Sequence, residues 1–189
     1  MFQANSADLE YLFESAGQKI LVNDVERISV ITNPALSEFD QKYIHTLEQV
    51  LQGDMVTLEG ERYLVITESI SKRGGKYKAL MRHCNVVVEI KNYTKQLIGH
   101  TDFGEPVYED VYVDSTYIPS IIDNKSFSID SSSAIRVPEN QIVVVIQDNS
   151  YNREKFMVND TFSFEGNYKV LNRDFTKKGL LILTCEKSV

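Results

Sequence analysis

One short strand-rich pattern occurs twice in the chain, and this repeat limits the folds open to it more than any other feature. Residues 53–66 align with residues 159–171 after a gap of one residue, and residues 71–74 fall on 176–179 in the same register. The residues that match are Asp54 with Asp160, Gly60 with Gly166, and Tyr63 with Tyr168. Any hairpin with a glycine turn offers part of this likeness, but the second match in register favours two copies of one small β module.

The matching residues suit a strand, a tight turn and a second strand. An Asp before a strand can bond to nearby backbone groups, and a Gly at the tip accepts a positive φ. A Tyr packs its ring on such a hairpin and keeps its hydroxyl in water. The pattern therefore predicts a hairpin in each copy, within two barrel-like or curled-sheet modules.

The rest of the chain reads mainly as further strands. Residues 6–16 place apolar side chains on one face and predict a short helix, and residues 19–32 predict a hairpin that turns at Asn23 and Asp24. Residues 37–51 fit a helical stripe or an edge strand, and we favour the helix. We expect a mostly β protein with a short N-terminal helix, divided into modules at 1–95 and 96–189.

Charge and hydrophobicity exclude several classes of protein. The 20 basic and 27 acidic residues give a net charge of -7, which argues against a sequence-independent nucleic-acid binder. The longest apolar run, residues 142–146, is too short to cross a membrane, and the first residues do not resemble a signal peptide. We therefore expect synthesis in the cytoplasm, with Cys84 and Cys185 as buried free thiols.

Residues with catalytic or metal-binding potential do not form a recognisable motif. The chain contains no Gly-x-Ser-x-Gly, phosphate-binding loop or Cys-x-x-Cys motif. His83 and Cys84 are neighbours on an expected strand, so they point to opposite faces and cannot hold one ion together. We expect no enzymatic activity, no cofactor and no metal, although a hydrolase built on two carboxylates remains an alternative.

Two segments are candidates for interaction. Residues 107–117 alternate Tyr or Val with acids, which fits either an ordinary sheet strand or an extended arm that gives its tyrosines to an interface. The interface candidates are Tyr108, Asp110, Tyr112, Asp114 and Tyr117. The loop 69–76 is the second candidate, with a solvated hairpin tip as the alternative, and its cations are Lys72, Arg73 and Lys76.

Several of these segments resemble virion proteins of tailed bacteriophages encoded near the head–tail connector genes. The resemblance covers most of residues 50–187 and is carried by residues 53–54, 60, 63–66, 78–85, 121–125, 144–149 and 179–187. It implies a small β protein, of the head-closure (stopper) or adaptor type, in a ring that closes or extends the DNA channel.

The resemblance also implies partners and a location. The partners would be further copies of the chain and the neighbouring connector and tail proteins, with at most non-specific proximity to DNA and no membrane. The protein would be made in the host cytoplasm and reside in the virion. In stopper proteins a barrel loop points into the channel, which makes Lys72, Arg73 and Lys76 channel-loop candidates. The alternatives are another tail-ring or tail-tip protein and, less favoured, a small ligand-binding or enzymatic β domain.

Overall fold

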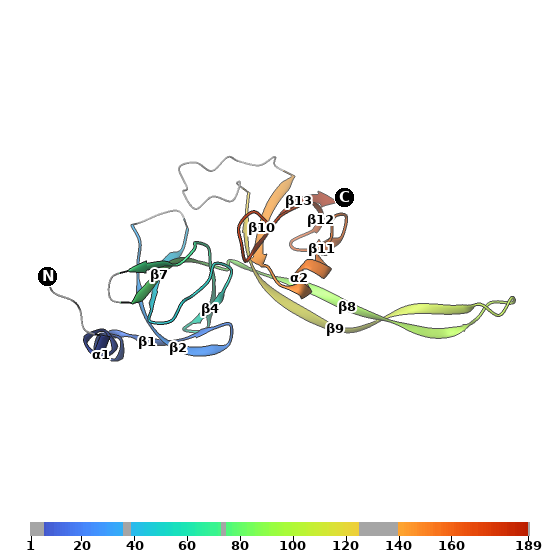
Figure 1. Ribbon diagram of the computed structural model, residues 1–189. Helices are drawn as coiled ribbons and strands as arrows, with labels where there is room; N and C mark the ends of the chain where they lie inside the picture. The colour runs from blue at the N-terminus through green and yellow to red at the C-terminus, as the bar shows by residue number, and fades with distance from the viewer. Residues whose placement is uncertain (1–5, 36–38, 73–74, 125–139, 189) are drawn as a thin grey trace.

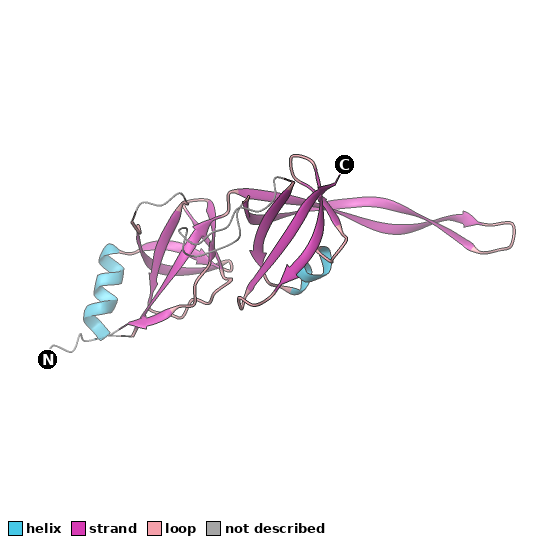
Figure 2. Cartoon of the chain, turned by 90° about the horizontal axis from the view of Figure 1, so that it is seen from above, coloured by secondary structure: helices cyan, strands magenta, loops and turns pink. Residues whose placement is uncertain are grey.

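The computed structural model describes residues 6–35, 39–72, 75–124 and 140–188, and it confirms a mostly β protein with a short N-terminal helix. Two rounded sheets lie side by side, and one long hairpin extends from the second (Figures 1 and 2). Helix α1 (Ser6–Ala16) precedes the first sheet and buries Leu9 and Phe13. It ends as expected at Gly17, whose N–H donates to the Phe13 carbonyl at 2.9 Å.

The first sheet curls into a ring. Its strands follow the order β3-β2-β1-β4-β5-β7-β6, and β3 also pairs with β7. Their bounds are β1 (Gln18–Val22), β2 (Val25–Thr32), β3 (Gln41–Thr46), β4 (Met55–Leu58), β5 (Glu61–Val65), β6 (Ile70–Lys72) and β7 (Lys76–His83). The β3–β7 pairing closes the ring, so we call this unit the first barrel.

The second sheet is a closed barrel in the order β10-β13-β12-β11-β8-β9. Its strands are β8 (Val86–His100), β9 (Pro106–Asp123), β10 (Gln141–Gln147), β11 (Thr161–Ser163), β12 (Asn167–Asp174) and β13 (Leu180–Ser188). A short helix, α2 (Ser150–Lys155), joins β10 to β11 and is capped by the Asn149 side chain. Because β8 pairs with strands of the second sheet from Val86 onward, the chain changes sheet at residues 84–85, earlier than the boundary expected at 95.

The two barrels share one pattern of strand pairing. In the first, β1 pairs with β2 and β4, β5 with β4 and β7, and β3 with β2 and β7. In the second, β8 pairs with β9 and β11, β12 with β11 and β13, and β10 with β9 and β13. The repeat seen in residues 53–66 and 159–171 thus extends to the whole of both barrels.

Hydrogen bonds within the repeat match atom for atom. The N–H groups of Gly53 and Asn159 donate to the carbonyls of Val65 and Val170 at 2.8 and 2.9 Å. Both hairpins turn on a Glu-Gly pair with positive φ: Glu59 (53°) and Gly60 (89°), then Glu165 (46°) and Gly166 (140°). Glu59 and Gly60 are the two central residues of a tight turn between Leu58 and Glu61, which requires positive φ at both. The second turn is one residue longer, because β11 and β12 pair only as far as Ser163 and Asn167, and Gly166 again accepts a positive φ.

A third hydrophobic cluster joins the two barrels. Each barrel has its own core, and the third cluster combines side chains of both. Strand β10 shows how this works: Val144 faces its own core, while Val143 and Val145 face the first barrel. Residues 142–146 are therefore buried on both faces, which accounts for an apolar run without alternation.

Two expectations about local structure are corrected. The helix favoured over residues 37–51 is wrong: β3 (Gln41–Thr46) is a strand held between β2 and β7, with Ile44 and Thr46 buried. Strand pairing on both sides outweighs the helical stripe of apolar residues. The sequence analysis also did not predict helix α2. Residues 126–133, whose polar, serine-rich composition predicts a surface loop, lie outside the described residues.

Candidate functional site

The long hairpin of β8 and β9 is the candidate functional site, and we call its residues 91–117 the arm. The two strands pair from Val86 with Ser120 as far as His100 with Pro106. At the barrel, Glu89 also pairs with β11, and residues 121–123 pair with β10. Further out, among the described residues, β8 and β9 have only each other as strand partners, and the arm extends away from both barrels (Figures 1 and 2).

The arm occupies the place of a two-residue turn in the first barrel. By strand pairing, β8 and β9 correspond to β1 and β2, which are joined by Asn23 and Asp24 with φ of 47° and 64°. A barrel of this topology therefore closes without an arm. The extra length of β8 and β9 is therefore not needed to close a barrel of this topology.

All five interface candidates lie on this hairpin, and all are exposed. Tyr108, Tyr112 and Tyr117 expose 55%, 51% and 65% of their surface, and Asp110 and Asp114 are also open to solvent. Of the two possibilities left open by the sequence, the structure has the extended arm rather than a covered sheet strand.

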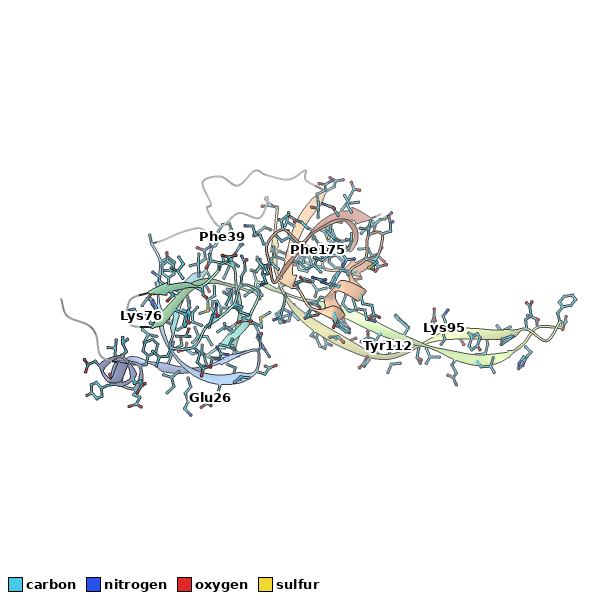
Figure 3. All side chains as sticks on the ribbon, viewed as in Figure 1. Glu26, Phe39, Lys76, Lys95, Tyr112 and Phe175 are labelled. Carbon is cyan, nitrogen blue, oxygen red and sulfur yellow. The ribbon has the colours of Figure 1, made fainter. Side chains whose placement is uncertain are left out.

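Strand register collects some of the candidates on one face of the arm. The cross-strand pairs on this face are Tyr93 with Tyr112, Lys95 with Asp110, and Leu97 with Tyr108. The rings of Tyr93 and Tyr112 meet edge to face with centroids 6.1 Å apart. We call these six residues the paired face; Figure 3 labels Lys95 and Tyr112 on the arm.

The remaining two candidates are separated from the paired face. A bulge interrupts the register after Asn92, so Asp114 and Tyr117 lie beyond it on the barrel side. Asp114 accepts a hydrogen bond from the Asn92 amide at 2.9 Å, and Tyr117 lies opposite Glu89. These two residues belong to the base of the arm.

Further exposed apolar residues of the arm, among them Tyr93, Leu97 and Phe103, were missed by the sequence analysis. Tyr93 and Leu97 lie on β8 with 57% and 48% of their surface exposed, and Phe103 at the tip exposes 95%. The tip is a turn in which the N–H of Gly104 donates to the carbonyl of Thr101 at 2.8 Å. Tyr93 and Leu97 are an even number of residues apart, so on a strand they share one face. This spacing is a signal that could have identified β8 as the second strand of the arm.

Two of the channel-loop candidates, Lys72 and Lys76, lie on the first barrel, away from the arm. Lys72 ends β6 and lies opposite Lys76 at the start of β7. Figure 3 shows Lys76 on the first barrel, far from the labelled residues of the arm. Arg73 lies outside the described residues.

The repeat residues hold the fold together. The Asp54 carboxylate accepts hydrogen bonds from the N–H of Leu51 at 2.7 Å and from the Asn23 amide at 2.8 Å. Tyr63 is buried, and its hydroxyl donates to Asp40 at 3.3 Å. Tyr168 is half-buried and stacks on Phe162 with centroids 6.1 Å apart. The residues shared by the two modules are therefore structural.

The groove between the barrels contains polar side chains that are already bonded to one another. It has a volume of about 370 Å³ and is lined in part by Asn23, Gln147 and Asn152. The side-chain oxygen Oδ1 of Asn23 accepts from the Met55 N–H at 2.9 Å and from the Gln147 side-chain amide at 3.0 Å. The Asn152 side-chain amide donates to the backbone carbonyl of Gln147 at 2.7 Å. The hydrogen bond between Asn23 and Gln147 joins the two barrels.

Neither cysteine offers reactive chemistry. Cys84 and Cys185 are free and buried, as the sequence predicts. Burial raises the pKa of each thiol to about 12, so both stay protonated near neutral pH. Among the residues that the structure describes, no three His, Cys, Asp or Glu side chains come together in a group that could hold a metal ion.

A family model described as the YomX C-terminal domain matches residues 24–186, which covers most of the chain and includes the arm. The chain belongs to this family. The family is phage-derived, so this is a phage-associated protein. No curated protein and no solved structure matches the chain. Within the described ranges no helix is both long and apolar enough to cross a membrane.

Proposed function

We propose that the protein is a structural component of a tailed-phage virion, built into the head–tail connector (neck) ring that closes or extends the DNA channel. The observation that carries this proposal is the exposed two-stranded arm. A lone hairpin is at best marginally stable in water, so an arm of this length gains most from a partner that covers it.

The side chains of the arm are of the kind that interfaces use. Tyrosines and large aliphatic residues contribute much contact area at low entropic cost, and here they are exposed on both strands. In contrast, Asn23, Gln147 and Asn152 in the groove of about 370 Å³ between the barrels use their polar groups in hydrogen bonds within the protein, which does not favour that groove as a ligand-binding or enzymatic site.

The net charge agrees with a place beside DNA without tight binding to it. Each phosphate contact made by a Lys or Arg adds salt-dependent affinity, which a channel for moving DNA must avoid. A chain with net charge -7 makes few such contacts. A position in another ring of the tail, or at the tail tip, would explain the exposed arm equally well. The experiment below distinguishes these locations.

Immunogold electron microscopy of phage particles with an antibody to this protein tests the proposal. We expect gold at the head–tail junction. Gold along the tail or at its tip would retain a structural role but contradict the neck. Particles without gold would contradict the virion proposal, provided that an antibody to a known capsid protein labels the same particles.

A further inference from the structure

The paired face of the arm is arranged in three layers. Tyr93 and Tyr112 form the layer nearest the barrel, Lys95 and Asp110 the middle one, and Leu97 and Tyr108 the outer one. One cation and one anion thus lie between two apolar layers. All six side chains are exposed, so within the described part of the chain nothing covers this face.

The paired faces of two copies are complementary when a two-fold axis that runs parallel to the arm relates one arm to the other. In that arrangement the two arms run parallel, and β8 of each copy faces β9 of the other. Lys95 of one copy then faces Asp110 of the other, twice, and each apolar layer meets its own equivalent. An antiparallel arrangement would instead place Lys95 on Lys95 and Asp110 on Asp110, where like charges repel.

Addition of a partner strand to the edge of the arm is less favourable. Bulges after Asn92 and after Leu97 break the edge of the hairpin, and Lys91 and Lys95 place charges along β8. Bulges and edge lysines are the features by which proteins block strand addition. The face of the arm, rather than its edge, is the surface available for contact.

We infer that the arm binds the arm of a second copy of this chain, face to face and parallel, through the paired face. The inference deepens the proposed function, on which it rests for the role of the arm in assembly. Such a contact is isologous and closes on two copies. A ring would then consist of arm-paired dimers joined through their barrels.

Charge reversal tests the contact, with the mass of the full chain measured by analytical ultracentrifugation at about 100 µM, where micromolar affinity gives mostly dimer. Lys95→Asp leaves two anions in the middle layer, and Asp110→Lys leaves two cations. Each variant alone should dimerise at least roughly tenfold more weakly than the wild type, because both ionic contacts become repulsive.

Mixing the two variants is the decisive step. In the mixed dimer the two anions of one copy face the two cations of the other, so dimers should return to within about threefold of the wild-type affinity. The like-charged pair within each copy persists in the mixture, so recovery comes only from contact between copies. Glu109→Lys, one residue away on the opposite face, is the matched control and should dimerise like the wild type.

The outcomes separate this inference from the proposed function. A wild type that stays monomeric at this concentration, or a mixture that does not recover, would overturn arm pairing. If gold still labels virions in that case, the partner of the arm is a different virion protein and the proposed function stands. Dimers with the expected charge dependence would support arm pairing even if no particle were labelled.

Discussion

Gly53 and Gly179 lie in backbone contact where the two barrels meet. A Cβ on Gly53 would collide with the carbonyl of Gly179, and a Cβ on Gly179 would collide with the carbonyl of Gln52. Both glycines also have positive φ, of 90° and 81°. Only glycine meets both requirements, so these two positions set how closely the barrels can approach.

Alanine at either position should therefore destabilise the protein through both effects. We expect Gly53→Ala and Gly179→Ala each to lower the free energy of unfolding by about 3 kcal/mol or more, as strain and a backbone clash combine. Gly60→Ala is the matched control, because its φ of 89° is the same and no atom lies within 4 Å of its added Cβ. It should cost about 1 kcal/mol. Equal losses for the three variants in urea unfolding would contradict a tight contact.

Arg82 and Asp123 form a buried ion pair between β7 and β9, with nitrogen and oxygen 2.6 Å apart and side chains 6% and 15% exposed. Arg82→Met should lower the free energy of unfolding by about 3–5 kcal/mol, because it leaves a buried carboxylate without its partner. Lys19→Met breaks the exposed pair with Glu26 and should leave the free energy of unfolding nearly unchanged, because water already screens this pair. The double variant Arg82→Met with Asp123→Leu should be more stable than Arg82→Met in denaturant titrations; a less stable double variant would refute the explanation.

Asp54 and Asp160 make the same hydrogen bond in the two copies of the repeat. Their carboxylates accept from the N–H groups of Leu51 and Met157 at 2.7 and 2.9 Å. Removing an Asp side chain that caps a turn costs about 1 kcal/mol, so Asp160→Ala should lose about that amount. Asp54→Ala should lose more, because Asp54 also accepts from Asn23. Thermal unfolding of the two variants side by side gives the order, and a larger loss for Asp160→Ala would contradict it.

The sequence revealed the parts of the fold that depend on local chemistry. Gly60 and Gly166 marked the two hairpins, and Asn23 with Asp24 marked a third, because tight turns accept few residue types. β3 was misread as helix, since its pairing on both sides comes from strands distant in the sequence. The apolar run 142–146 indicated a core strand but not its second burial face, which the other barrel provides.

The sequence indicated only one of the two strands of the arm, β9. The alternation of Tyr with acidic residues indicated the strand β9. The same sequence pattern occurs in strands that a third strand covers and in strands that it does not. Its exposure follows from the absence of further pairing beyond Glu89 in the described residues, which is a property of the whole barrel. Tyr93 and Leu97 can be assigned to the paired face only from the strand register, which places them opposite Tyr112 and Tyr108.

The Asp148 carboxylate should make the free energy of unfolding depend on pH in the acidic range. Two hydrogen bonds from the Arg153 guanidinium hold the pKa of Asp148 below its usual value. A lowered pKa adds stability that is present above the ordinary carboxyl range and is lost as the pH falls through the pKa of the folded protein. We expect the stability advantage of the wild type over Asp148→Asn to shrink between about pH 5 and pH 3. Urea titrations across this range measure it, and a constant or growing advantage would contradict the assignment.

Removal of the arm should leave the barrels folded. The variant replaces residues 93–113 with Asn-Gly, so that Asn92 and Asp114, which face each other across the two strands, are joined by a tight turn. The β1–β2 hairpin shows that this topology closes in two residues. No residue of the arm belongs to the three hydrophobic clusters of the described residues, which reach only Ile90 and Ile118 on either side of it. We expect a thermal midpoint within about 4 °C of the wild type, the upper end of the shift that a change of about 1 kcal/mol gives in a chain of this size.

The same variant should fail to assemble. Because it lacks the paired face and the exposed tip, it should remain monomeric in solution and be absent from virions when it is supplied in place of the wild type. Circular dichroism checks the fold first, so that loss of assembly is not confused with unfolding. A variant that unfolds would show that the arm supports the barrel, and a folded variant that still enters virions would show that assembly uses a surface of the barrels instead.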